Sequence, residues 1–305
     1  MIPHIVRSGA STHGRDGGPN GHRQMGATMN TNEPEANAAA APDLRDHLMR
    51  HRSVRRYRPD PVPDATLRRI LEAGIRASSA GNMQPYSIVV TRDRALRERL
   101  HAPHMQQDMV LEAPVLLTFC ADFHRMKRWL ALSDAADGFA DPFAFLVAAI
   151  DAVLVSQNVA LAAEAEGLGI CYLGSTLANC HEIGRILELP RHVVPVTGMV
   201  MGTPAEDPPQ RDRLPFAGLV HFETYRDPDD DGIRTIYRER ETAGWARYMA
   251  DPWLRARVEE TGVRNLAQIY SQVKYTREAH ATFSENLLGY LREQGFLGEE
   301  AWASG

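Results

Sequence analysis

Two short segments in the first third of the chain combine side chains that can hold a phosphate group and the polar edge of a flat ring. Residues 51–57 read HRSVRRY and residues 77–85 read ASSAGNMQP. Guanidinium, imidazole and hydroxyl groups all donate hydrogen bonds, and a guanidinium can grip one phosphate with two of them. Neither segment has the glycine spacing of a dinucleotide-binding fingerprint or of a P-loop. The residue types therefore indicate a phosphate-bearing ligand held by a different kind of site.

A further pair of basic residues, Arg211 and Arg213, follows a proline-rich turn far along the chain. For residues 51–56, composition alone gives a solvated basic edge about equal weight with a binding site, because runs of charge usually face water. The pair would complete a converging set of donors if the fold brings it to the first two segments. His101 and His104 have a spacing compatible with metal binding, but no third convergent ligand accompanies them, and we expect no metal site.

The elements that must position these groups indicate an α+β fold. β-branched and apolar runs predict strands, and amphipathic or uniformly apolar stretches predict helices. Strands are expected over residues 86–91, 113–120, 170–173 and 193–202, and helices over residues 43–49, 64–77, 92–100, 143–166 and 180–187. Asp64 is expected to cap the second of these helices, which leads directly into the second donor segment.

The helix predicted over residues 143–166 is hydrophobic nearly all round. Such a helix must be covered on every side, either by its own core or by a second subunit, so we expect an oligomer. Polar residues interrupt the helix and argue against a membrane span: Asp151, Gln157, Asn158, Glu164 and Glu166.

The composition is that of a soluble globular chain of 305 residues, with 44% apolar and 24% charged residues. The formal net charge is -5 and no clustered basic surface is evident, which argues against a nucleic-acid partner. The three cysteines, Cys120, Cys171 and Cys180, lack CxxC spacing and indicate reduced thiols in a cytoplasmic protein.

The chain divides into three parts by composition. Residues 1–42 are rich in glycine, asparagine and alanine without apolar periodicity, and we expect disorder there. Residues 43–225 carry the predicted strands and the donor segments, and we expect them to form the binding core. Residues 226–305 include an acidic stretch at 227–231 and are predicted to form a charged helical extension.

Six motifs in a fixed order carry a family resemblance. They are HRSVR at 51–55, SSAGNMQP at 78–85, GLG at 167–169 followed by YLGS at 172–175, LP at 189–190, MGTP at 201–204 and RDRLP at 211–215. In this order they resemble the nitroreductase and flavin reductase family, and more narrowly its NADPH-dependent, oxygen-insensitive subgroup with a C-terminal helical extension. The resemblance covers residues 43–225 well and the remainder loosely.

The resemblance implies a nitroreductase-like fold, in which helices flank a central, mostly antiparallel sheet and an intertwined homodimer holds FMN non-covalently at its interface. It implies an NAD(P)H-dependent FMN oxidoreductase that passes hydride from NADPH through FMN to nitroaromatic, quinone or free flavin acceptors by a ping-pong mechanism. No catalytic side chain is implied, because the flavin N5 carries the hydride. Two alternatives stay open: a flavin-binding or flavin-modifying relative without NADPH turnover, and a non-flavin α/β protein that binds another phosphate ligand.

The resemblance also assigns the residues that bind the cofactors. The residues implied to bind the FMN phosphate and ribityl chain are His51, Arg52, Ser53 and Arg55. Arg211 and Arg213 are implied to reach both the phosphate and the pyrimidine side of the flavin. The other implied FMN contacts are Ser79 from the other subunit, Gln107 at the ring edge, and Tyr172, Leu173, Gly174 and Ser175 over the ring. The candidates for binding the 2'-phosphate of NADPH lie in the extension: Arg264, Lys274 and Arg277. The alternatives are a surface turn at Gln107 and, over residues 262–296, a helical pair that packs the dimer.

Overall fold

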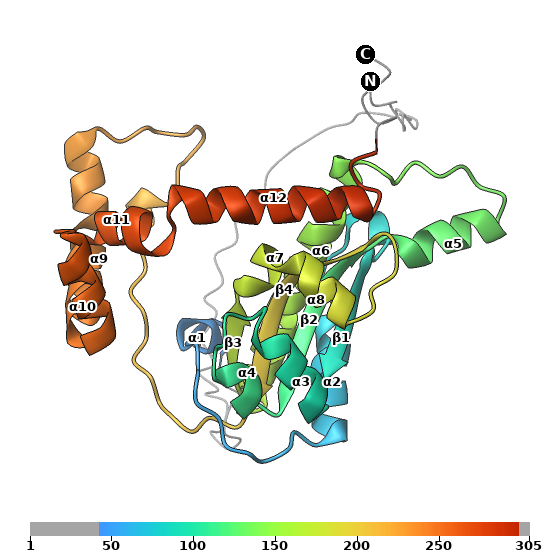
Figure 1. Ribbon diagram of the computed structural model, residues 1–305, viewed down its shortest axis with the longest axis horizontal. Helices are drawn as coiled ribbons and strands as arrows, with labels where there is room; N and C mark the ends of the chain where they lie inside the picture. Colours follow the sequence, from blue (N-terminus) through green and yellow to red (C-terminus); the bar gives the residue numbers. More distant parts are fainter. Residues whose placement is uncertain (1–42, 299–305) are drawn as a thin grey trace, which may run out of the picture. The chain divides into compact units, whose positions relative to one another are not determined.

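A computed structural model of the chain describes residues 43–298, and it contains a four-stranded antiparallel sheet (Figure 1). The strands are β1 (Tyr86–Thr91), β2 (Val115–Asp122), β3 (Gly169–Leu173) and β4 (Val193–Gly202), in the order β1-β2-β4-β3. Every neighbouring pair is antiparallel, which confirms the predicted α+β class. The segment 1–42, for which we expect disorder, lies outside the described residues.

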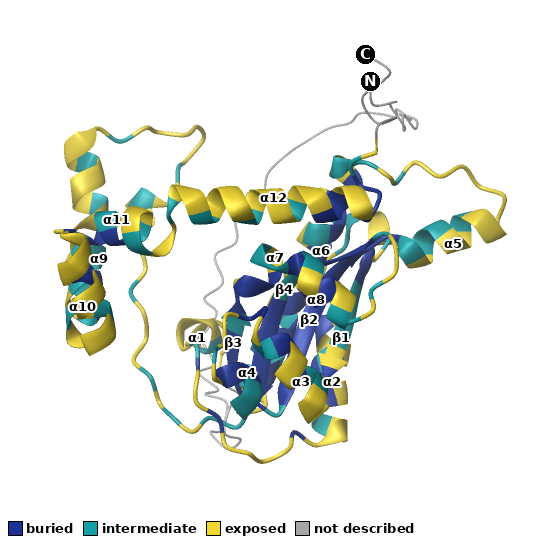
Figure 2. Cartoon of the chain, viewed as in Figure 1, coloured by how far each residue is buried: buried dark blue, intermediate teal, exposed yellow. Residues whose placement is uncertain are grey.

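Burial on both faces of the sheet explains the continuous apolar run of its second strand, β2. All eight residues of β2 are buried. Alternate residues point to opposite faces, so Leu117 and Phe119 pack in one apolar cluster while Leu116 packs in another. The first cluster includes α2 (Asp64–Gly74) and α6 (Pro142–Ala165), and the second includes α3 (Arg94–His101), α4 (Met109–Glu112) and α8 (Cys180–Ile186). Helices thus cover both sides of the sheet, and Figure 2 shows burial concentrated on the strands.

The first donor segment follows α1 (Leu44–Met49) and continues the edge of the sheet. Ser53 forms an isolated parallel bridge with Ile170 of β3, and the Val54 amide donates to the Ile170 carbonyl at 2.9 Å. A Cβ on Gly169 would lie 2.8 Å from the Cβ of Val54, so this close approach requires glycine. Backbone pairing therefore holds the segment in place while its arginine side chains stay exposed.

The predicted long apolar helix is α6, which begins at a side-chain cap on Asp141 and runs for 24 residues. One face packs in the core, through residues such as Val155 and Val159. The opposite face is exposed in this chain and carries large apolar side chains: Phe143, Leu146, Ile150, Val153 and Leu154. Within residues 43–298, α6 alone is long and apolar enough to cross a membrane, but its most apolar window is 50% buried, as expected for a core helix.

The described part of the extension is helical. It contains α9 (Asp230–Ala250), α10 (Pro252–Thr261), α11 (Leu266–Gln268), a π-helical turn (Ile269–Lys274) and α12 (Arg277–Glu293). A small apolar cluster of its own joins Tyr248, Val258, Val263, Leu266 and Ile269. The end of α12 packs elsewhere, because Tyr290 and Leu291 join a cluster with Phe145 of α6. The extension therefore combines a separate small core with one helix end fixed near the sheet.

Two details of the helices differ from the prediction. Asp64 is the first residue of α2 and not its cap, because Pro63 occupies the cap position and the Asp64 carboxylate binds Arg92 instead. The sequence pattern also does not predict α4, α5 (His124–Leu132) or α7 (Ser175–Ala178). No residue of α5 is buried, and α4 and α7 span only four residues each, which is too short for a helical period to show.

Candidate functional site

A cationic pocket of about 630 Å³ brings Arg55 of the first donor segment together with Arg211 and Arg213. The convergence expected of these residues is therefore present. The remaining lining residues are Asp212 and side chains of the extension: Arg240, Arg247, Tyr248, Asp251, Leu254, Tyr270, Lys274 and Tyr275. The volume lies within the range of about 300 to 1,000 Å³ that is usual for small-molecule sites.

Asp212 ties the basic pair to the extension. Its carboxylate accepts from Arg240 Nε at 3.0 Å and from Arg247 Nη1 at 3.1 Å, and its carbonyl accepts from Arg240 Nη2 at 3.2 Å. Partial burial of Asp212 opposes ionisation, but the hydrogen bonds and charges of the two arginines outweigh it and lower the pKa. Asp212 is therefore ionised at neutral pH and neutralises part of the charge that α9 brings to the pocket.

The other cations of the pocket lack such partners. Within residues 43–298, no carboxylate lies at salt-bridge distance from Arg55, Arg211, Arg213 or Lys274. The pKa of Arg211 is lowered, first by desolvation and then by the charges of Arg247 and Arg55. An anion bound among these guanidinium groups would relieve that repulsion, and a phosphate matches their geometry.

The rest of the first donor segment lies beside this pocket but is not part of its lining. His51 Nδ1 lies 2.7 Å from Glu164 Oε1, and the hydrogen bond raises the pKa of His51 more than partial burial lowers it. Arg52 forms an exposed ion pair with Asp207 at 2.7 Å. Ser53 is half-buried in its bridge to β3. Of these three, His51 is the residue whose charge interacts with the pocket, because the charge of Arg213 opposes its protonation.

Gln107 and Ser175 form a buried cluster with His104. The Gln107 amide donates to the His104 carbonyl at 2.9 Å and to Ser175 Oγ at 3.3 Å, while Ser175 Oγ lies 3.0 Å from His104 Nδ1. Burial, with a smaller contribution from His101, lowers the pKa of His104 to about 4, so its ring is neutral at pH 7. The Ser175 side chain therefore hydrogen-bonds inside the protein, and only the backbone of residues 172–175 is available to contact a ligand.

In the segment from Tyr172 to Ser175, the space beside Gly174 is open. Gly174 is exposed, and a Cβ built on it would meet no atom within 4 Å. The neighbouring Leu173 is buried, and the Tyr172 hydroxyl lies 3.0 Å from Ser156 Oγ of α6. A flat ligand could approach the backbone at Gly174 without displacing a side chain.

The second donor segment is anchored to α6 at its beginning. The Ser79 hydroxyl donates to Asp151 Oδ2 at 2.6 Å, and the Ala80 amide donates to the same carboxylate. Asp151 is 1% exposed, so this is a buried anchor. Ser79 is not among the residues that line the cationic pocket, and a single chain does not bring the two together.

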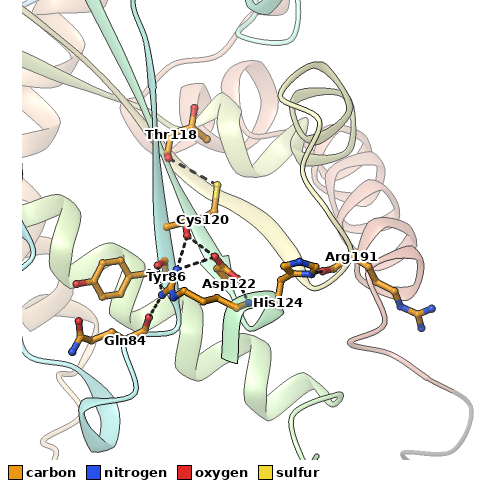
Figure 3. Close-up of polar contacts among 9 residues, drawn as sticks. Gln84, Tyr86, Thr118, Cys120, Asp122, His124 and Arg191 are labelled. Carbon is orange, nitrogen blue, oxygen red and sulfur yellow. Dashed lines mark hydrogen bonds and ion pairs between the residues drawn. The ribbon is translucent and has the colours of Figure 1, made fainter. Parts of the chain in front are cut away.

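The end of the second donor segment is fixed by a polar network around Asp122 at the end of β2 (Figure 3). The Arg125 guanidinium donates to the Gln84 carbonyl at 2.8 Å and to the Tyr86 carbonyl at 3.2 Å. Between the two anchors, Asn82 and Gln84 have positive φ angles of 55° and 53°. Such strain in residues other than glycine persists only where the surroundings enforce it, and it is common at ligand-binding loops.

The family model described as the nitroreductase family matches residues 48–203, which include both donor segments and the segment from Tyr172 to Ser175. The chain belongs to the nitroreductase family. The match ends before Arg211 and does not reach the extension.

Two named relatives are similar over much of this nitroreductase-family chain. The oxygen-insensitive NADPH nitroreductase of Salmonella typhimurium is 36% identical over 193 residues, which are 63% of this chain and 78% of that protein. The FMN reductase (NAD(P)H) of Bacillus subtilis is 32% identical over 241 residues, 71% of this chain and 96% of that protein.

Solved structures of the same fold extend the similarity into the extension. A Bacteroides fragilis protein assigned as an oxidoreductase is 40% identical with a TM-score of 0.76, covering 83% of this chain and 100% of that one. The NADPH:FMN oxidoreductase of Vibrio harveyi, solved with NAD+, is 26% identical with a TM-score of 0.65, covering 83% of this chain and 98% of that one.

This member of the nitroreductase family also has pocket residues that the sequence motifs do not identify. Arg240 and Arg247 lie seven residues apart on α9, a spacing of two helical turns that puts both on one face. Two sequence features could have identified Arg240 and Arg247. One is their seven-residue spacing, and the other is Asp212, which lies between Arg211 and Arg213 and needs basic partners. Of the candidates for NADPH binding, Lys274 lines the pocket, whereas Arg264 and Arg277 are not among its lining residues.

Proposed function

We propose that the cationic pocket binds the phosphate of FMN and that the chain transfers hydride from NADPH to nitroaromatic, quinone or free flavin acceptors. The observation that carries the proposal is the convergence of Arg55, Arg211 and Arg213 in one pocket, where none of the three has a carboxylate partner among residues 43–298. As a member of the nitroreductase family with relatives named NADPH nitroreductase and FMN reductase, the chain is an NAD(P)H-dependent flavin oxidoreductase. The finer assignments below are ours.

The residues present fit FMN at both ends of the molecule. The guanidinium groups match a phosphate, and His51 adds a ring nitrogen beside Arg213. The open backbone at Gly174 leaves room for a flat ring system. We assign Arg52, Ser53, Gln107 and the backbone from Tyr172 to Ser175 to contacts along the ribityl chain and the ring edge.

Bound FMN would supply the redox chemistry, taking a hydride from the nicotinamide and delivering it to the acceptor. The side chains of this protein would bind and orient, and no proton-transferring residue is needed for the hydride step. We propose a ping-pong mechanism because donor and acceptor would use the same open face in turn. An open site of this kind favours flat, electron-poor acceptors of several classes.

We propose NADPH as the preferred donor because the pocket holds more cations than one phosphate requires. Lys274 lies with its Nζ 5.0 Å from the centre of the Tyr248 ring and has no carboxylate partner in the described chain. Arg247 lines the same pocket and reaches it from α9. These two residues are our candidates for the 2'-phosphate, which distinguishes NADPH from NADH.

We also propose a homodimer in which a second subunit covers the apolar face of α6. In one chain Phe143 and Ile150 of this face are 74% and 59% exposed, which is unfavourable for a solvated helix. We assign Ser79 to the flavin of the second subunit, because in one chain it does not line the cationic pocket. The buried thiols of Cys120, Cys171 and Cys180 are free, which fits a cytoplasmic protein.

The deciding experiment is to purify the protein, record its spectrum, and follow NADPH and NADH oxidation with nitrofurazone, a quinone and free FMN in parallel. A yellow protein that oxidises NADPH with these acceptors is the expected result. A colourless protein that binds no added FMN would reject the flavin assignment. Bound FMN that neither NADPH nor NADH reduces would leave a flavin-binding relative without turnover.

A further inference from the structure

The ion pair between His51 and Glu164 joins the first donor segment to the C-terminal end of α6. Nδ1 of His51 lies 2.7 Å from Oε1 of Glu164, and the two side chains are 25% and 13% exposed. The other carboxylate oxygen, Oε2, is buried and has no hydrogen-bond partner in the described structure. Because a buried unpaired carboxylate oxygen is unfavourable, packing alone does not account for a glutamate at this position.

The geometry determines what the rest of the imidazole ring can do. A carboxylate accepts hydrogen bonds only, so Nδ1 of His51 must carry a proton. Nε2 then carries either a lone pair, in the neutral ring, or a second proton, in the charged ring. Within residues 43–298 nothing hydrogen-bonds to Nε2 of His51. A phosphate can accept only from the charged form, because a lone pair on Nε2 would repel it.

The surroundings of the pair contain few other titratable groups. Arg213, on the segment that follows β4, opposes protonation of His51. Tyr172 of β3 has a pKa raised first by burial and further by the charge of Glu164, so its hydroxyl stays neutral. On α1, His47 Nε2 lies 3.0 Å from the Leu161 carbonyl. The hydrogen bond from Glu164 is the largest influence on His51, and it raises the pKa of the ring.

We infer that Glu164 is a positioning residue for the flavin phosphate: it holds the Nδ1 side of His51 and leaves a protonated Nε2 to donate to the phosphate. The inference rests on the proposed function, because it places the FMN phosphate beside His51. Glu164 touches neither cofactor nor substrate and acts through the histidine. With its ring protonated, His51 would add a charged donor to the arginines of the pocket.

The arrangement makes FMN affinity depend on pH with a defined sign. The protonated ring binds the phosphate, so affinity is highest below the pKa of His51 and falls as pH rises through it. That pKa lies above the ordinary value of about 6.5 because of Glu164. Loss of one charge-assisted hydrogen bond to phosphate weakens binding by about ten-fold or more.

The test is the dissociation constant of FMN from purified holoprotein between about pH 6.5 and about pH 9.5, above the second phosphate pKa of about 6. Glu164→Gln keeps an acceptor for Nδ1 but removes the charge, so the fall in affinity should move to lower pH. His51→Gln should lose the pH-dependent step. The matched control is Glu166→Gln, also near the end of α6, where Glu166 binds Arg69 on the surface at 2.8 Å. This control should leave the profile unchanged.

Riboflavin, which lacks the phosphate, separates this inference from the proposed function. A pH step with FMN and none with riboflavin is the expected pair of results. If the wild-type protein binds FMN tightly with no pH step, or if Glu164→Gln keeps the wild-type profile, the positioning role is wrong while the flavin assignment stands. If no variant, including wild type, binds FMN at any pH, the proposed function fails first.

Discussion

The sheet region and the extension obtain their rigidity in different ways. In β2 every residue is buried and both faces are covered by helices. In α12 the buried residues are Tyr290 and Leu291, and α9 buries Gly244 and Tyr248 over its 21 residues. The sheet region is therefore held by a continuous core, whereas the extension relies on one small cluster, on the apolar end of α12 and on polar contacts.

The two regions also hold the arginines of the pocket in different ways. Arg55 projects from a segment whose backbone pairs with β3 and with Glu206, whose carboxylate accepts from the Arg55 amide at 2.6 Å. Arg240 and Arg247 reach the pocket from α9, where Asp212 holds them. Changes in the core should therefore alter folding, and changes in the extension should alter ligand binding with little effect on the core.

The strongest test of the comparison is a pair of buried truncations. Phe119→Ala removes a fully buried ring between the sheet and its helices and should lower the free energy of unfolding by about 4 kcal/mol. Ile269→Ala removes a fully buried side chain from the small cluster and should cost about 3 kcal/mol, but only for opening the extension. Urea unfolding and limited proteolysis distinguish the two. Equal loss of the main transition in both variants would show that the regions fold as one unit.

Arg55→Ala should have the next largest effect, on cofactor affinity. If Arg55 binds the phosphate as proposed, removing its guanidinium should weaken FMN binding by about thirty-fold, or about 2 kcal/mol. Arg56→Ala is the matched control, because Arg56 pairs with Glu112 at 3.1 Å and does not line the pocket. Flavin fluorescence on dilution measures both. Unchanged affinity in Arg55→Ala would remove Arg55 from the phosphate site.

Lys274→Ala tests whether the extension selects the nicotinamide donor. Loss of one cation for the 2'-phosphate should raise the KM for NADPH by about ten-fold, leaving NADH turnover and FMN content unchanged. Arg257→Ala on α10 is the control, because Arg257 pairs with Glu260 on the surface. Steady-state kinetics with both nucleotides decide the outcome, and an equal change with NADH would contradict the assignment.

The smallest expected effect belongs to Asp212→Asn, which weakens the connection between the two regions. Loss of the charge should reduce the contact with Arg240 and Arg247 by about 1 kcal/mol, because these groups are only partly shielded from water. Residues 203–229 should then be cleaved faster by protease while the main unfolding transition stays in place. Equal cleavage rates in wild type and variant would show that other contacts hold the extension.

Local residue types are enough to define much of the architecture. Apolar or β-branched runs predict the four strands, and β2 reads as a nearly continuous apolar run because both of its faces are buried. The uniform apolarity of residues 143–166 predicts α6 in the same way, and the order of the motifs indicates the family. Short helices such as α4 escape this reasoning because four residues are too few to show a helical period, and α5 buries no residue in the core.

Only the folded chain decides which of the predicted site residues act together. Arg55 and Arg211 converge because β3 and the segment after β4 bring distant parts of the chain to one edge of the sheet. The Ser79 hydroxyl turns to Asp151, the Ser175 hydroxyl to His104, and the ring of His51 to Glu164. These partners lie at least 71 residues away in sequence. Local pattern cannot specify them, because side-chain direction at such sites is set by long-range packing and hydrogen bonding.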